Sequence, residues 1–377
     1  MKLRRLRAVS RKEFLHILRD PRSLGGALAI PLFMLILFGY GLTLDVDRVP
    51  TIVRDHDATA QSRDLTARFT ASRYFDVLGH AGSYEAIENS IDRDRALAAI
   101  VIPRGFARDL LAGRTASVQV IIDGSDSNTA GIARGYVDSI IAGYSREVRA
   151  ESLERRGAGE LRNPVETRLR VLYNSEMKSR NYIVPGLIAV IVAIIATLIT
   201  SLTIAREWEN GTMEQLLSTP VRPAELVLGK MSAYIVLGAI DTLVSVLVGV
   251  FLFDVPLRGN PLRLIIPTFL FLFGSLAWGL MISAIARSQV VAYQLAMVSS
   301  FLPAFLLSGF VFSIETMPAP IQVITHIVPA RYFVTSLKGI FLKNVSSSVL
   351  AGELAFLIVY AAVVFAVATR KLRQKVA

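Results

Sequence analysis

Acidic and turn-forming residues alternate in a short stretch past the middle of the chain. They are Glu207, Glu209, Gly211, Thr212, Glu214, Leu217 and Pro220. Glycine permits a sharp turn, a threonine followed by helix formers can cap a short helix, and proline ends a helix. The pattern predicts a small rigid helix over 213–217 that presents carboxylates to a basic surface on another protein. The alternative is a plain connecting loop with ordinary polar residues.

The rest of the sequence holds no pattern typical of catalysis or metal binding. The chain has no cysteine, which excludes disulfides, cysteine-ligated metal sites and cysteine nucleophiles. His56 and His80 lack the spacing of metal ligands, and we interpret Asp55 and Asp57 as solvated charges at the end of a strand. The stretch 123–126 lacks the spacing of a calcium loop and predicts a turn that caps a helix. We therefore expect no catalytic residue, metal or cofactor in this chain.

Asp241 is a carboxylate deep inside an apolar segment. Ionisable groups at such positions are costly and usually face a cavity or a partner. Asp241 is therefore a candidate intramembrane polar site that binds a substrate or a proton. The alternative is a structural role, in which Thr242, Ser245 or a facing helix satisfies the carboxylate.

These residues must be positioned by apolar segments, of which six are long enough to cross a bilayer, roughly 20 residues each. They are 24–44, 183–204, 226–253, 264–286, 290–312 and 349–369. Several contain proline, which membrane helices tolerate better than soluble ones. The first is not followed by a small-residue cleavage site, so we interpret it as a retained helix and not as a signal peptide. The sequence therefore predicts a polytopic α-helical membrane protein.

The distribution of charge predicts how these spans are oriented. A net charge of +11 over 377 residues could indicate a nucleic-acid partner, but the stretch 45–180 holds 20 basic and 20 acidic residues, so the excess lies elsewhere. By the positive-inside rule, both termini and the loops 205–225 and 287–289 face the cytoplasm, and 45–180, 254–263 and 313–348 face outside. We therefore expect the excess charge to meet anionic lipid, with no nucleic acid as partner.

Three polar regions flank the spans. Residues 1–22 combine apolar residues at near-helical spacing with many basic ones, which predicts an amphipathic interfacial helix on the cytoplasmic leaflet. Asp20-Pro21 ends that pattern, because a residue before proline avoids the helical region. Residues 370–377 form a basic cytoplasmic tail. In 45–180, strand-like and helix-like segments alternate, which predicts an extracytoplasmic α/β domain on a small, largely parallel sheet.

The stretch 206–220 resembles the coupling segment of ABC-2 type exporter permeases, Arg-Glu-x-Glu-x-Gly-Thr-x-Glu-x-Leu-x-x-x-Pro, and every position of that pattern is present. A second set of motifs also resembles this family. It comprises Leu307-Ser308-Gly309-Phe310-Val311-Phe312, Met317-Pro318, Pro329-Ala330-Arg331-Tyr332-Phe333 and Lys338-Gly339-Ile340. Ser313 stands where the family commonly has proline. The order of parts matches the branch with a large external domain after the first span, which resembles drug or multidrug efflux permeases.

The resemblance implies a permease subunit that is not itself an enzyme. It implies a dimer, with an identical or a sister permease, and a separate cytoplasmic ATPase that binds ATP and magnesium. The segment around 207–217 would sit in a groove of that ATPase. The chain has no Gly-x-x-x-x-Gly-Lys-Ser/Thr loop of its own, in agreement with a separate ATPase.

The resemblance also implies how the outer side is closed and where the protein acts. Short re-entrant helices in 313–348 would close the path, with an external gate at Gly309, Phe310, Pro318, Pro329 and Arg331. The compound moved would be hydrophobic or amphiphilic, drug-like, and exported across a bacterial inner membrane. By analogy with related efflux systems, the external domain would contact a periplasmic adaptor protein and, through it, an outer-membrane channel.

Two other classes of function compete with this interpretation. An ion-coupled secondary transporter would need relays of ionisable groups or inverted repeats, and a single intramembrane carboxylate argues against it. A membrane-anchored sensor or scaffold would explain an external domain that binds a ligand or partner. It would leave the coupling-like stretch at 206–220 unexplained.

Overall fold

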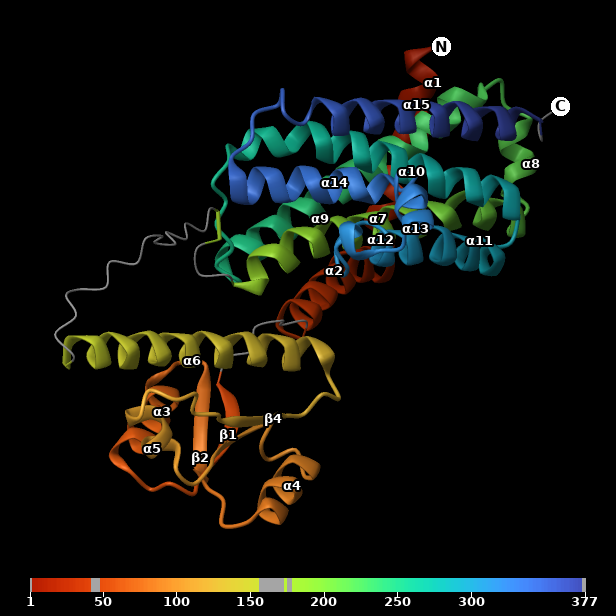
Figure 1. Ribbon diagram of the computed structural model, residues 1–377. Helices are drawn as coiled ribbons and strands as arrows, with labels where there is room; N and C mark the ends of the chain where they lie inside the picture. Colours follow the sequence, from red (N-terminus) through yellow and green to blue (C-terminus); the bar gives the residue numbers. More distant parts are fainter. Residues whose placement is uncertain (1, 42–47, 156–172, 175–177, 375–377) are drawn as a thin grey trace. The chain divides into compact units, whose positions relative to one another are not determined.

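The computed structural model describes residues 2–41, 48–155, 173–174 and 178–374. The chain divides into two compact units (Figure 1), residues 1–43 with 170–377, which we call the helical unit, and residues 44–169, which we call the α/β unit. The end of the first expected span (42–44), parts of the expected external domain (45–47, 156–172 and 175–177) and the end of the tail (375–377) lie outside the described residues.

The α/β unit is built on a four-stranded sheet in the order β2-β1-β3-β4. The strands are β1 (Val49–Asp55), β2 (Phe75–His80), β3 (Ala98–Ile102) and β4 (Gln119–Ile122). β1 pairs in parallel with β2 and with β3, whereas β4 pairs antiparallel with β3. The sheet is therefore small and largely parallel, as its alternating segments indicate.

Helices pack on both faces of this sheet. They are α3 (Ala60–Ala71), α4 (Tyr84–Asp92), α5 (Phe106–Leu111) and α6 (Ser127–Arg155). One core joins α3, α5 and α6 to the sheet through Phe69, Phe106 and Tyr144, and a smaller core on the other face joins α4 through Ile87. Because both faces are covered, every residue of β3 is buried.

Asp55 and Asp57 are partly exposed but bind groups of the α/β unit, which corrects the sequence-based interpretation of them as merely solvated charges. Asp57 accepts hydrogen bonds from the backbone N–H groups of Gly105 (2.7 Å) and Ala107 (2.9 Å), where α5 begins. Burial opposes ionisation, but these donors hold the pKa of Asp57 below its usual range. Asp55 accepts from the hydroxyl of Ser62 in α3 (2.6 Å). Asp57 thus binds free backbone donors at the start of α5, and Asp55 holds the start of α3 through the Ser62 hydroxyl.

In the described part of the helical unit, six helical segments are long and apolar enough to cross a membrane. They are Leu24–Gly41 within α2 (Pro21–Gly41), α7 (Ser179–Glu209), α9 (Pro223–Phe251), η1 (Pro261–Leu264) with α10 (Ile265–Ala286), α11 (Gln289–Ala296) with the π-helical turn η2 (Met297–Phe301) and α12 (Leu302–Leu306), and most of α15 (Ala351–Gln374). In the most apolar stretch of α7, 83% of the residues are buried, against 17% in the corresponding stretch of α2. α7 is therefore the central helix, and the outer ones keep apolar faces for lipid.

Two of these segments differ clearly from the expected spans. α7 continues to Glu209, five residues beyond the expected end, so the first part of the expected coupling loop is helical. The fifth segment ends at Leu306 although the apolar sequence continues to Phe312. The reason is local backbone geometry, because Gly309 adopts a left-handed φ of +78° that no helix can contain. A π-helical turn also precedes Pro303, whose missing N–H breaks the regular ladder.

Several connections gather at one end of the helical unit, which we call the α8 end. α1 (Leu3–Arg19), α8 (Thr212–Leu217) and the turn between α10 and α11 lie there. Gln289 donates its backbone N–H to Glu209 (2.8 Å), and Lys2 donates its own to Glu225 at the start of α9 (2.6 Å). These are the segments for which the sequence predicted a common, cytoplasmic side.

The other connections gather at the opposite end, which we call the α14 end. η3 (Ile314–Thr316), α13 (Ala319–Thr325), α14 (Pro329–Lys338) and the π-helical turn η4 (Gly339–Lys343) lie there. In the turn between α9 and η1, Gly259 donates its N–H to the carbonyl of Ile340 (3.0 Å). Loops for which the sequence predicted the external side thus share this end.

Candidate functional site

α8 is a short helix that follows α7 directly and is held in a fixed position. Gly211, between the two helices, has a left-handed φ of +69°, which lets the chain turn sharply. The side chain of Met213 is fully buried and anchors the helix, whereas Glu214 is exposed. Thr212 does not cap α8 as expected, because its hydroxyl donates instead to the carbonyl of Glu207 at the end of α7 (3.3 Å).

The far end of α8 is held by the N-terminal helix. Leu217 is the last residue of α8, and its side chain lies outside the described set. The carbonyl of Pro220, three residues later, accepts a hydrogen bond from the guanidinium of Arg5 in α1. α8 is thus held at its start by α7 and just beyond its end by α1.

Two of the three candidate carboxylates bind groups within the helical unit; Glu207 is buried there, whereas Glu209 stays exposed. Glu207 is only 8% exposed and lies 2.6 Å from the Nζ of Lys12 and 2.9 Å from the Nζ of Lys230. Glu209 binds both the backbone and the side-chain amide of Gln289. The physical reason is the extension of α7, which turns both side chains toward neighbouring helices.

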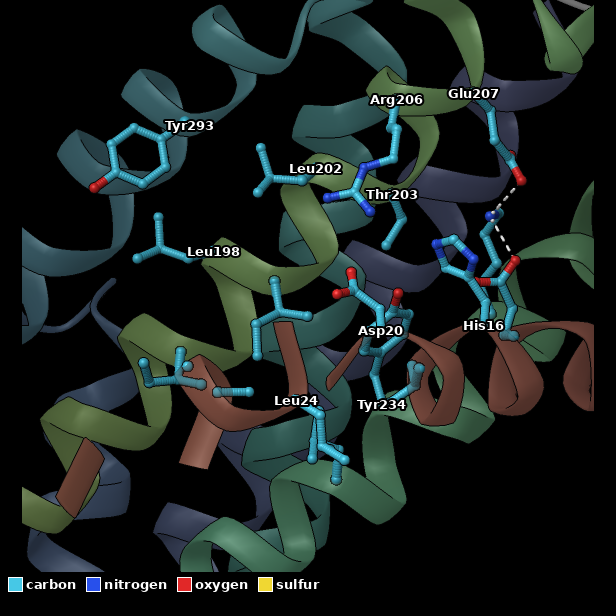
Figure 2. Close-up of a pocket in the computed structure, with 18 of the residues that line it drawn as sticks. His16, Asp20, Leu24, Leu198, Leu202, Thr203, Arg206, Glu207, Tyr234 and Tyr293 are labelled. Atoms are coloured by element: carbon cyan, nitrogen blue, oxygen red, sulfur yellow. Dashed lines mark hydrogen bonds and ion pairs between the residues drawn. The ribbon is translucent and has the colours of Figure 1, made fainter. Parts of the chain in front are cut away.

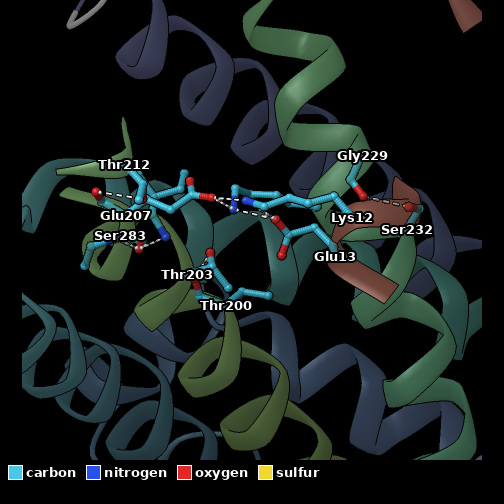
Figure 3. A network of polar contacts seen from close by, with 12 residues as sticks. Lys12, Glu13, Thr200, Thr203, Glu207, Thr212, Gly229, Ser232 and Ser283 are labelled. Atoms are coloured by element: carbon cyan, nitrogen blue, oxygen red, sulfur yellow. Dashed lines mark hydrogen bonds and ion pairs between the residues drawn. The ribbon is translucent and has the colours of Figure 1, made fainter. Parts of the chain in front are cut away.

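The structure shows a group of four charges, Lys12, Glu13, Glu207 and Lys230, which we call the ion cluster (Figure 3); all but Lys12 are buried. Lys230 is 1% exposed and lies 2.9 Å from the carboxylate of Glu13, itself 2% exposed. Burial opposes ionisation of Glu13, but Lys230 and Lys12 hold the pKa of its carboxyl below the usual range. The ion cluster joins α1, α7 and α9 just beneath the turn into α8.

Sequence reasoning missed the ion cluster, although two signals point to it. Lys230 is a lysine within an otherwise apolar segment, and such a charge needs a partner. Glu13 is an acidic residue in a strongly basic N-terminal segment. The arrangement can carry a displacement of α8 into three long helices, because separating buried opposite charges is costly.

At the α14 end, the structure brings Gly309 and Phe310 together with residues of α7 and α14. The carbonyl of Gly309 accepts hydrogen bonds from the hydroxyl of Tyr182 (2.8 Å) and the Nζ of Lys338 (2.9 Å). That ammonium also lies 3.2 Å from the centre of the Tyr182 ring. Phe310 is 1% exposed and packs where Gly186 leaves room for its ring. Tyr182 was not among the expected gate residues.

The other expected gate residues shape the short helices. Pro318 precedes α13, and Pro329 is the first residue of α14, where a missing N–H is harmless. Arg331 of α14 donates to the hydroxyl of Thr325 in α13 (2.5 Å). These three residues order the short helices, whereas the hydrogen bonds to the Gly309 carbonyl come from Tyr182 and Lys338.

Asp241 is buried without a partner among the described residues. It is 3% exposed, and no described side chain or backbone group forms a hydrogen bond or ion pair with it. The expected structural partners do not bind it: the hydroxyl of Thr242 donates to the carbonyl of Gly238 (2.7 Å), and the hydroxyl of Ser245 is itself unpaired. The prediction that Thr242 or Ser245 satisfies the Asp241 carboxylate is therefore wrong.

A pocket of about 960 Å³ opens between α1, α2, α7, α8, α9, α11 and η2 (Figure 2). In Figure 2, Arg206, Asp20 and His16 gather on one side of it, and Leu198 and Tyr293 lie on the other. A void of about 10 Å³ lies deeper and is bordered by Asp241. Within the described residues, no group of three His, Asp or Glu side chains is placed to hold a metal ion.

Comparison with known proteins identifies relatives across nearly the whole chain. Residues 23–370 match the family model described as ABC-2 family transporter protein. The chain is 40% identical over 357 residues to the probable multidrug ABC transporter permease YbhS of Escherichia coli (strain K12), covering 94% of this chain and 93% of that protein. It is 31% identical over 372 residues to the probable multidrug ABC transporter permease YbhR, covering 99% of each. It is 28% identical over 295 residues to the inner membrane transport permease YhhJ, covering 78% of this chain and 77% of that protein.

Proposed function

The chain belongs to the ABC-2 family of transporter proteins, and we propose that it is the permease subunit of an ATP-driven exporter of hydrophobic or amphiphilic, drug-like compounds. The observation that carries the proposal is α8, a short helix with an exposed acidic residue whose base is joined to three long helices by the ion cluster. ATP and magnesium would bind to a partner ATPase. The names of the relatives YbhS and YbhR support multidrug export.

The proposed coupling starts with α8 in a groove of the ATPase. Of the three carboxylates, Glu214 is exposed and available to meet basic residues there, whereas Glu209, although also exposed, is bound to Gln289. When the ATPase closes, α8 moves, and the buried attractions of Lys230 to Glu13 and Glu207 draw α1, α7 and α9 with it. At the α14 end, the contact of Tyr182 and Lys338 with Gly309 closes the outer side and must open for release.

The proposal includes an orientation and further partners. The α8 end faces the cytoplasm, as its basic N-terminal helix favours, and the α/β unit lies outside a bacterial inner membrane. A second permease, identical or a sister chain, completes the path through the membrane. The α/β unit would contact a periplasmic adaptor protein, which would lead on to an outer-membrane channel.

Replacing Glu214 by lysine is expected to lower the amount of ATPase that co-purifies with the chain and the efflux of a drug panel by at least about tenfold, since like charges would then face each other across the interface. The matched control is Glu315→Lys, at another exposed acidic residue, which lies at the α14 end; it should leave both quantities unchanged. Co-purification measured by quantitative mass spectrometry and efflux measured in cells should fall together. Normal binding and efflux in Glu214→Lys would overturn the role of α8.

A further inference from the structure

The walls of the pocket suit an apolar molecule of drug size. At about 960 Å³, it lies within the range of small-molecule sites, roughly 300–1,000 Å³. Most of its lining is apolar and comes from several different helices. Examples are Leu24, Ile30, Ile194, Leu198, Met297 and Phe301. An occupant would therefore bury an apolar body between the helices.

The pocket continues toward Asp241. The small void at its deep end shares Ala27, Ile195 and Tyr234 with the pocket, so the two are neighbours. Tyr234, Leu237 and Asp241 follow one another at spacings of three and four along α9, which places them on one face of that helix. A molecule in the pocket would thus lie next to the void that Asp241 borders.

In the described part of the chain, Asp241 is a buried carboxylate that forms no ion pair. The cluster charges that border the pocket pair with one another, and Arg206 donates to the side chain of Gln289 (3.3 Å). Around Asp241, the void is lined by apolar side chains such as Val192, Leu272 and Leu276. A carboxylate in such surroundings favours a positively charged partner.

We propose that the pocket and Asp241 together bind a lipophilic amine, with its apolar body in the pocket and its protonated nitrogen beside Asp241. The void has room for about one water-sized group, which admits a primary ammonium and excludes a trimethylammonium. A primary ammonium also donates hydrogen bonds to the carboxylate, whereas a quaternary one cannot. That this amine is also an exported compound rests on the proposed function; its binding does not.

The test uses the purified full-length chain in lipid nanodiscs, without ATP, and a fluorescent primary amine, dansylcadaverine. We expect saturable binding that is at least about tenfold tighter than that of the N,N,N-trimethyl derivative. Asp241→Asn should weaken binding of the primary amine by at least about tenfold and leave the trimethyl derivative unaffected. Ala196→Leu, which fills the void without changing charge, should weaken the primary amine as well.

Ser245→Ala is the matched control, because it removes another unpaired polar group of α9 and should bind as the wild type does. Gel filtration and thermal unfolding establish that each variant is folded. Equal binding by Asp241→Asn and wild type, or equal binding of the two dyes by wild type, would overturn the inference. Because no ATP is present, such a failure leaves the proposed function intact, and binding without ATP-driven export would contradict only the proposed function.

Discussion

Replacement of Lys230 by methionine is expected to lower the free energy of unfolding by about 3–5 kcal/mol, the usual effect of breaking a buried ion pair on one side, and to abolish export. Lys230 lies 2.9 Å from both Glu13 and Glu207. Without it, two buried carboxylates share Lys12, whose side chain is 52% exposed. Because the ion cluster joins α8 to the long helices, loss of stability and loss of coupling should occur together.

Thermal and denaturant unfolding of the purified variants measures this effect. Lys12→Met is the matched control and should cost only about 0–1 kcal/mol, because a half-exposed pair is screened by water. Lys230→Met combined with Glu13→Leu should regain part of the lost stability, since the buried charge is removed with its partner. The lowered pKa of Glu13 means that its contribution exists at neutral pH and is lost as the pH falls through the folded-state pKa, below the ordinary value of 4.5. A Lys230→Met protein with wild-type stability and export would contradict this role.

The second large effect is expected at Gly279, where α10 crosses α7. A Cβ atom at this position would lie 2.1 Å from the hydroxyl oxygen of Thr200 and 2.4 Å from the carbonyl oxygen of Thr197. The carbonyl belongs to a helix backbone and cannot turn away. Gly279→Val is therefore expected to destabilise the helical unit by about 3 kcal/mol, the upper part of the range for overpacking.

The same unfolding measurements test this prediction. Gly25→Ala is the control, since nothing lies within 4 Å of its Cβ position in α2, and it should be neutral or slightly stabilising. Export should fall with Gly279→Val, because α7 carries α8 and is held by α10 at this crossing. A Gly279→Val chain as stable as Gly25→Ala would show that α7 and α10 do not pack as closely as described.

Hydropathy predicted the apolar segments well, but the residues at which the helices end depend on tertiary contacts and backbone turns, which a hydropathy profile does not report. The apolar run ends near Ile204, yet α7 continues because Glu207 pairs with Lys12 on α1 and with the buried Lys230 on α9. The run through Leu307 stays apolar, yet the helix stops because Gly309 turns the chain. In the α/β unit, alternation predicted β1 and β3, whereas the antiparallel direction of β4 has no local signal.

The candidate site was predicted in part, for a similar reason. The pattern of Glu214, Gly211 and Pro220 is local, and the structure has a short exposed helix there. The ion cluster joins residues 195 and 217 positions apart, which no local pattern can reveal. For Asp241, the sequence left a structural and a functional role open. The structure places apolar side chains around it, with its nearest polar neighbours turned elsewhere.

The central claim is that this chain moves lipophilic compounds on the free energy of ATP hydrolysis. Its most direct test is the accumulation of a panel of lipophilic dyes in inside-out membrane vesicles from cells with and without the chain and its co-purifying ATPase. We expect at least one dye to accumulate only with the chain and hydrolysable ATP, and to accumulate equally when an uncoupler collapses the proton gradient. Accumulation driven by the proton gradient without ATP, or the same accumulation without the chain, would contradict the claim.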